Sequence, residues 1–60
     1  MTSLTMPELE QVYDDLAAAI DRAPEGKSEL MLVKLALLLA QQVGDAERVR
    51  QCVTDAMHDL

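Results

Sequence analysis

The chain has one cysteine, one tyrosine and neither phenylalanine nor tryptophan among its 60 residues. A single cysteine cannot form a disulfide within the chain, and a free Cys52 fits a reducing compartment. Few aromatic rings are available to stack on bases. Eleven acidic residues against 5 basic ones also argue against nucleic acid, because phosphate contacts need an excess of lysine and arginine. We therefore expect no nucleic-acid partner.

We also expect neither a secretory leader nor a membrane span. Its first ten residues, MTSLTMPELE, have neither the basic region nor the apolar stretch of a signal peptide. The apolar run over residues 30–40 is shorter than the roughly 20 residues that cross a bilayer, and Lys34 interrupts it. We expect a cytoplasmic protein that does not contact membranes.

Helical spacing and capping residues predict a first helix over residues 6–23. Thr5 and Glu8 have the spacing of a capping box, with Pro7 in the first turn. Pro24 and Gly26 then end the helix. The apolar residues of this segment recur on one face at helical spacing; they are Leu9, Val12, Tyr13, Leu16, Ala19, Ile20 and Ala23.

Two further helices are predicted over residues 29–43 and 46–58. Ser28 is the predicted N-cap of the second helix, and Gly44 is its predicted left-handed C-cap. Asp45 follows at once as the N-cap of the third helix. Cys52 lies at the edge of the apolar face of this third helix, where we expect it to be a small buried residue. We expect one all-α domain, a helical hairpin plus a third helix, spanning residues 1–60 with residues 1–4 disordered.

The second helix is apolar almost all the way round, so it needs cover from several directions. A 60-residue chain hides only about 60% of the surface that its unfolded form exposes, which leaves little to provide that cover. One arc of the helix is expected to meet the other two helices: Leu32, Leu35, Ala36, Leu39 and Val43. The remaining residues are expected to meet a second chain, most simply in a homodimeric helical bundle: Leu30, Met31, Val33, Lys34, Leu37, Leu38 and Gln41.

In this interface hypothesis, Gln41 is a polar group near the seam that sets the register of the two chains. The alternative is that the other two helices wrap more widely round the second helix within one chain. Lys34 would then extend its aliphatic stem over the apolar surface and place its charge in water.

A second candidate surface is acidic, and the other candidates for chemistry are weak. Glu10, Asp14 and Asp21 share one side of the first helix, where they either dock a basic partner or keep the protein soluble. Asp55 and His58 provide too few ligands for a zinc site, and Cys52 has no activating base. We expect no catalytic, cofactor-binding or metal-ligating residue.

The sequence LALLLAQQVGD at residues 35–45, with Val12-Tyr13 before it and a short amphipathic tail after it, resembles the small bacterial family described as domain of unknown function 2783. The likeness covers roughly residues 8–57. The motif combines an apolar helix, its glycine cap and the next N-cap. The family often has arginine before the leucine run and histidine near its end, where this chain has Lys34 and Gln42, so no role at these two positions is carried over.

Members of this family look like small companions of FAD-dependent aromatic-ring hydroxylases, and some resemble the small coupling component of a two-part hydroxyphenylacetate hydroxylase. The resemblance implies that the chain binds a flavoprotein and helps to tie flavin oxidation to substrate hydroxylation. Ordering a lid and excluding water would achieve this without catalytic groups. The alternative from a different class is an acidic regulatory binder, antitoxin-like or an anti-activator, that occupies a basic protein surface.

Overall fold

The computed structural model describes residues 3–60, which form three helices and no strand in this range. Helix α1 spans Met6–Arg22, α2 spans Ser28–Val43 and α3 spans Ala46–Met57. The predicted all-α, three-helix fold class is confirmed, and each expected helix boundary lies within one residue of the observed one. Of the four residues expected to be disordered, the first two lie outside the described residues. Ser3 and Leu4 are exposed and precede α1.

Helix α1 begins at the predicted capping box. The Thr5 hydroxyl accepts a hydrogen bond from the Glu8 backbone N–H at 3.3 Å, and the Glu8 carboxylate accepts one from the Thr5 N–H at 2.8 Å. Two N–H groups that have no partner within the helix are thereby satisfied. At the other end, Ala23 adopts an extended conformation with φ −62° and ψ 140°, directly before Pro24. The helix stops there because the residue before a proline disfavours the helical region.

The predicted N-cap of α2 is wrong by one residue. Lys27 occupies the N-cap position without a side-chain capping bond, and Ser28 is already helical. The reason lies in the preceding turn, where the Lys27 N–H donates to the Pro24 carbonyl at 2.9 Å. The Lys27 carbonyl then accepts from the Met31 N–H at 2.9 Å, so the helical hydrogen bonds start one residue earlier than the serine suggests.

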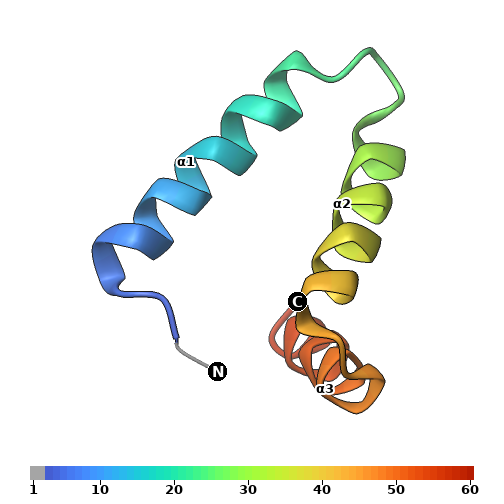
Figure 1. Ribbon diagram of the computed structural model, residues 1–60. Coiled ribbons are helices and arrows are strands. Elements are labelled where there is room, and N and C mark those ends of the chain that lie inside the picture. The colour runs from blue at the N-terminus through green and yellow to red at the C-terminus, as the bar shows by residue number, and fades with distance from the viewer. Residues whose placement is uncertain (1–2) are drawn as a thin grey trace.

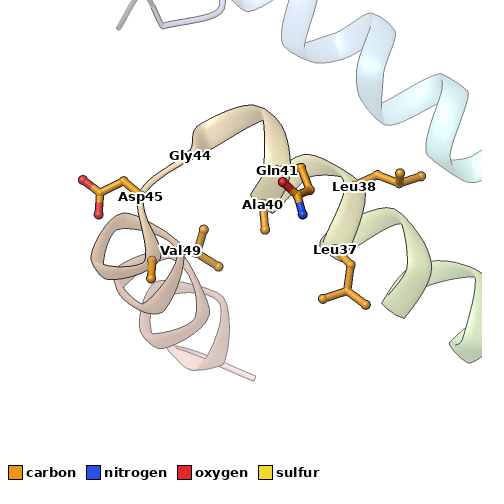
Figure 2. A pocket seen from close by; sticks show the side chains of 8 residues that line it. Leu37, Leu38, Ala40, Gln41, Gly44, Asp45 and Val49 are labelled. Atoms are coloured by element: carbon orange, nitrogen blue, oxygen red, sulfur yellow. The ribbon is translucent and has the colours of Figure 1, made fainter.

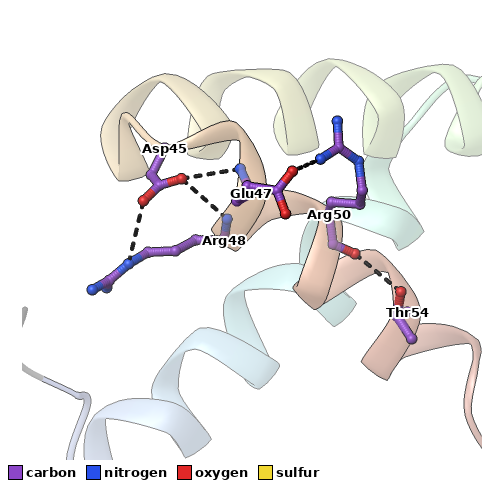
Figure 3. A network of polar contacts seen from close by, with 5 residues as sticks. All are labelled: Asp45, Glu47, Arg48, Arg50 and Thr54. Atoms are coloured by element: carbon purple, nitrogen blue, oxygen red, sulfur yellow. Dashed lines mark hydrogen bonds and ion pairs between the residues drawn. The ribbon is translucent and has the colours of Figure 1, made fainter.

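The junction between α2 and α3 follows the sequence closely. Gly44 has φ 71°, the left-handed conformation that suits glycine, and its N–H donates to the Ala40 carbonyl at 2.9 Å. One oxygen of the Asp45 carboxylate accepts from the Glu47 N–H at 3.0 Å and from the Arg48 N–H at 3.3 Å (Figure 3). With only these two residues between the helices, α3 turns sharply across the end of α2 (Figure 1).

None of the residues in the described range is buried, so the single chain has no hydrophobic core. Helices α1 and α2 diverge from their connecting loop (Figure 1). Intrachain cover was expected for one arc of α2, and this expectation is wrong for Leu32, Ala36 and Leu39, which are exposed. Only Leu35 and Val43 of that arc are partly covered. The chain leaves α1 in an extended conformation at Ala23, directly before Pro24, and α2 does not fold back over α1 (Figure 1).

The exposed area measures how open the single chain is. Its accessible surface is 5630 Å² for a mass of 6.6 kDa. A compact monomer of that mass exposes only about 3,900 Å². The chain therefore leaves about 1,700 Å² more in contact with water than a compact fold of the same size would.

Candidate interaction surface

All seven residues of the predicted interface lie on α2, and the structure leaves six of them exposed. The exception is Met31, which is partly covered. Leu37 and Leu38 are the most open apolar residues of the set, with 64% and 66% of their surface accessible. Single exposed leucines are ordinary on protein surfaces, whereas several exposed apolar residues on one helix mark a site of contact. The apolar row of α2 consists of Leu30, Val33, Leu37 and Leu38.

Two shallow hollows run along this row. The first lies beside the start of α2, between a pair of lysines and several apolar side chains; its lining residues are Lys27, Leu30, Met31, Lys34, Leu35 and Leu38. The second lies where the end of α2 meets the start of α3, and Leu37, Leu38 and Gln41 contribute to it. Six of the seven predicted interface residues therefore line a hollow, and Val33 does not.

The second hollow is formed by two helices together. Figure 2 shows Leu37 and Gln41 of α2 and Val49 of α3 directed toward the same space, while the Asp45 carboxylate points away from it. Its walls are mostly apolar, with the Gln41 amide as a polar group among them. Val49 was not predicted as part of this surface. Its position on the apolar face of the third helix was the available signal, but its proximity to Gln41 depends on the turn at Gly44.

The three acidic residues of the candidate acidic face lie on α1. Glu10, Asp14 and Asp21 are all exposed. None of the three forms a hydrogen bond or an ion pair with another part of residues 3–60. The neighbouring Asp15 differs, because its carboxylate accepts a hydrogen bond from the Gln11 amide at 3.1 Å. The three unengaged carboxylates give α1 a negatively charged side.

The polar contacts of α3 are local and lie at its surface (Figure 3). The Arg48 guanidinium is 3.6 Å from the Asp45 carboxylate, and Arg50 pairs with Glu47. The Thr54 hydroxyl donates to the Arg50 carbonyl at 3.2 Å. Exposed pairs of this kind contribute between about 0 and 1 kcal/mol each, so they support the helix without joining it to the rest of the chain.

The remaining candidate residues are also at the surface. Cys52 is exposed, so the prediction of a buried thiol is wrong; no part of residues 3–60 buries it. Asp55 accepts a hydrogen bond from the Gln51 amide at 3.0 Å, and His58 lies 3.7 Å from Asp59. Within the described part of the chain, no group of three or more histidine, cysteine, aspartate or glutamate side chains could share a metal ion.

Among residues 3–60, the carboxyl group of Glu8 has a shifted pKa. The Thr5 backbone N–H donates to the Glu8 carboxylate, and this bond, helped by the Thr5 hydroxyl, lowers the pKa of Glu8 below its usual value. The charged form is favoured because it accepts the hydrogen bond. Glu8 therefore stabilises the start of α1. By its helical spacing it also lies at the edge of the apolar face of this helix.

Comparison of the chain with models of known protein families, with curated proteins and with solved structures finds no match. Across residues 3–60, no helix combines the length and the apolar character needed to cross a lipid bilayer. The exposed apolar row on α2 and the acidic side of α1 are thus the two candidate surfaces for binding a partner.

Proposed function

We propose that this chain is a small, non-enzymatic interaction protein that completes its core with other polypeptides. It forms a homodimer through α2 and acts as the accessory subunit of a flavin-dependent aromatic-ring hydroxylase. The observation that carries the association is the absence of any buried residue among residues 3–60. Hydrophobic burial is the main favourable term in folding, and here it has not been gained within one chain.

The size of the exposed surface is consistent with a dimer. Two separate copies expose about 11,000 Å², whereas a compact dimer of about 13 kDa exposes about 6,400 Å². Pairing with full compaction would therefore bury about 4,800 Å² in total. Obligate homodimers bury about 2,000–5,000 Å², so one partner copy is enough to provide the missing core.

The link to a hydroxylase is supported by the resemblance of residues 35–45 to the companion family. In this role the protein binds next to the flavin and limits the access of water, so that reduced flavin reacts productively with oxygen and substrate. The apolar row that remains beyond the homodimer contact is the surface that a larger partner would cover.

Two experiments test the proposal, one for the self-association and one for the accessory role. Sedimentation equilibrium of the purified chain at low micromolar concentration should give the mass of a dimer. With an FAD-dependent aromatic-ring hydroxylase as the partner, NADH consumed per hydroxylated product should fall when this protein is added. A compact monomer would contradict the association, and an unchanged ratio would contradict the accessory role.

A second candidate function is supported by the acidic side of α1. Glu10, Asp14 and Asp21 are exposed and unengaged, as expected for a regulator that occupies a basic protein surface. Reversing these three charges to lysine separates the two functions. A regulator would lose its basic partner, whereas a hydroxylase companion would be more sensitive to changes at Leu30 and Leu37.

A further inference from the structure

Helices α1 and α2 carry the same apolar pattern 21 residues apart. In α1 the pattern consists of Leu9, Val12, Leu16 and Ala19. In α2 it consists of Leu30, Val33, Leu37 and Ala40. Each set follows the three-then-four spacing of coiled-coil core positions and occupies about 80° of the helix circumference. Two faces with this spacing can pack side by side with like residues opposed.

The polar residues that border the two faces include one complementary pair of charges, Glu8 and Lys34. Glu8 and Asp15 lie along one edge of the α1 face, seven residues apart. Lys34 and Gln41 lie along one edge of the α2 face, also seven residues apart. When the helices run parallel with Leu9 opposite Leu30, these edges meet, because flanking residues of parallel helices pair across the seam. Glu8 then faces Lys34, and Asp15 faces Gln41.

The helices also match in length. Helix α1 has 17 residues and α2 has 16, which correspond to about 25 Å and 24 Å. In the parallel alignment, residues 7–22 of α1 lie opposite residues 28–43 of α2, so the two helices overlap over the whole of α2.

This alignment requires a second copy of the chain. Five residues, 23–27, connect α1 to α2 and can span at most about 20 Å. A parallel arrangement within one chain would need the connection to return along the whole helix, about 25 Å. The α1 helix of the same chain can reach α2 only in the antiparallel direction. That arrangement puts Glu8 and Lys34 on opposite sides of the seam.

We propose that α1 of one copy packs in parallel on α2 of a second copy, in the register that places Val12 opposite Val33. The reciprocal contact forms at the same time, so the dimer contains two equivalent helix pairs related by a twofold axis. This inference rests on the proposed self-association and specifies its geometry. In this arrangement, the predicted interface residues Leu30, Val33 and Leu37 meet the amphipathic face of α1 from the partner copy.

Disulfide trapping tests the register. In a Cys52→Ser background, the double variant Val12→Cys/Val33→Cys should oxidise to a covalent dimer with two disulfides. The double variant Val12→Cys/Leu37→Cys is the matched control, because an antiparallel closure within one chain would place Val12 beside Leu37. The single variant Val12→Cys should form no covalent dimer above background.

Cross-linking within the monomer by the control pair, and none by the Val12–Val33 pair, would overturn the inference. The mass of the parent chain separates the two proposals. A parent that sediments as a dimer without the Val12–Val33 cross-link leaves the association standing and rejects the register. A monomeric parent rejects both.

Charge variants at an exposed position provide a second measurement that does not depend on cysteine. Gln41→Lys places a cation opposite Asp15 of the partner twice per dimer, and should lower the dimer Kd about 2- to 10-fold at low salt. Gln41→Glu should raise the Kd by a similar factor. The same two changes at Gln42, which faces outward in this alignment, are the control. Equal effects at the two positions would contradict the proposed contact.

Discussion

Replacing Leu37 by alanine should weaken self-association strongly, because this side chain has little cover within its own chain. Leu37 is 64% accessible in one chain, and the proposed dimer covers it. Full burial of a leucine contributes about 1.5–3 kcal/mol, so about 1–2 kcal/mol remains to be gained on association. A residual cavity adds to this, because large-to-small changes at buried sites cost about 2–5 kcal/mol.

A cost of about 2 kcal/mol per copy amounts to about 4 kcal/mol in a dimer with two equivalent sites. Since about 1.4 kcal/mol corresponds to a tenfold change, Leu37→Ala should raise the dimer Kd about 1,000-fold. Sedimentation equilibrium over a range of concentrations measures this change. Thermal unfolding by circular dichroism should show the same effect as a lower Tm that still depends on protein concentration.

The control for this experiment is Leu60→Ala. Leu60 is 95% accessible and follows the last helix, so its truncation should change stability by no more than about 0.5 kcal/mol. Alanine is also the better helix former, so a Leu37 that faces water in the assembled protein would give a neutral or slightly stabilising change. An unchanged Kd and Tm for Leu37→Ala would refute the burial of this residue.

Three further predictions concern the caps and the candidate chemistry. Asp45→Ala removes the N-cap of α3 and should destabilise the protein by about 1 kcal/mol in chemical denaturation, whereas Asp45→Asn should cost little. The pKa of Glu8 is lowered in the folded chain, so the unfolded chain binds a proton more readily. Acid should therefore weaken the start of α1, as the pH falls from the usual glutamate pKa toward the lowered pKa of Glu8. NMR amide shifts of the first turn should follow this titration, and Glu8→Gln, which keeps an acceptor for the Thr5 N–H, should abolish it. Cys52→Ala and His58→Ala should leave partner binding and hydroxylase coupling unchanged, and a loss of either function would instead indicate a thiol- or imidazole-dependent activity.

The local features of the fold could be predicted from the sequence because they depend on a few neighbouring residues. The capping box of Thr5 and Glu8, the left-handed Gly44 and the Asp45 cap each involve residues within four positions of one another. Ser28 was placed wrongly for a similarly local reason. The turn hydrogen bond from Lys27 to Pro24 competes with serine capping, and the residue preference alone does not reveal it.

The relation between the helices could not be predicted in the same way. Whether Leu39 is covered depends on the direction in which α2 leaves the loop, and that direction is set by the backbone angles of residues 23–27, which include the extended Ala23 and the left-handed Gly26. The hollow that contains Val49 depends likewise on the angle at which α3 crosses α2. Periodicity identifies the apolar side of each helix, but it does not identify the helix that packs on that side.

The lack of a core has a consequence for how the helices themselves are maintained. Helices of 12–17 residues are marginal in water when isolated, because helix nucleation is costly and each further residue contributes little. The caps of α1 and α3 contribute about 1 kcal/mol each, and α2 has no side-chain N-cap. Local interactions therefore do not hold the three helices in place for a chain that remains alone.

Tertiary burial must provide the remaining stability, and in this chain it becomes available through contact between chains. Folding and association are then one process, in which the helical content measured at a given temperature rises with protein concentration. A preformed monomer would instead show constant helical content on dilution. In a coupled system, a partner that covers α2 also determines how much of this protein is folded. Burial of the apolar surface of α2 would then provide both the binding of the partner and the stability of the chain.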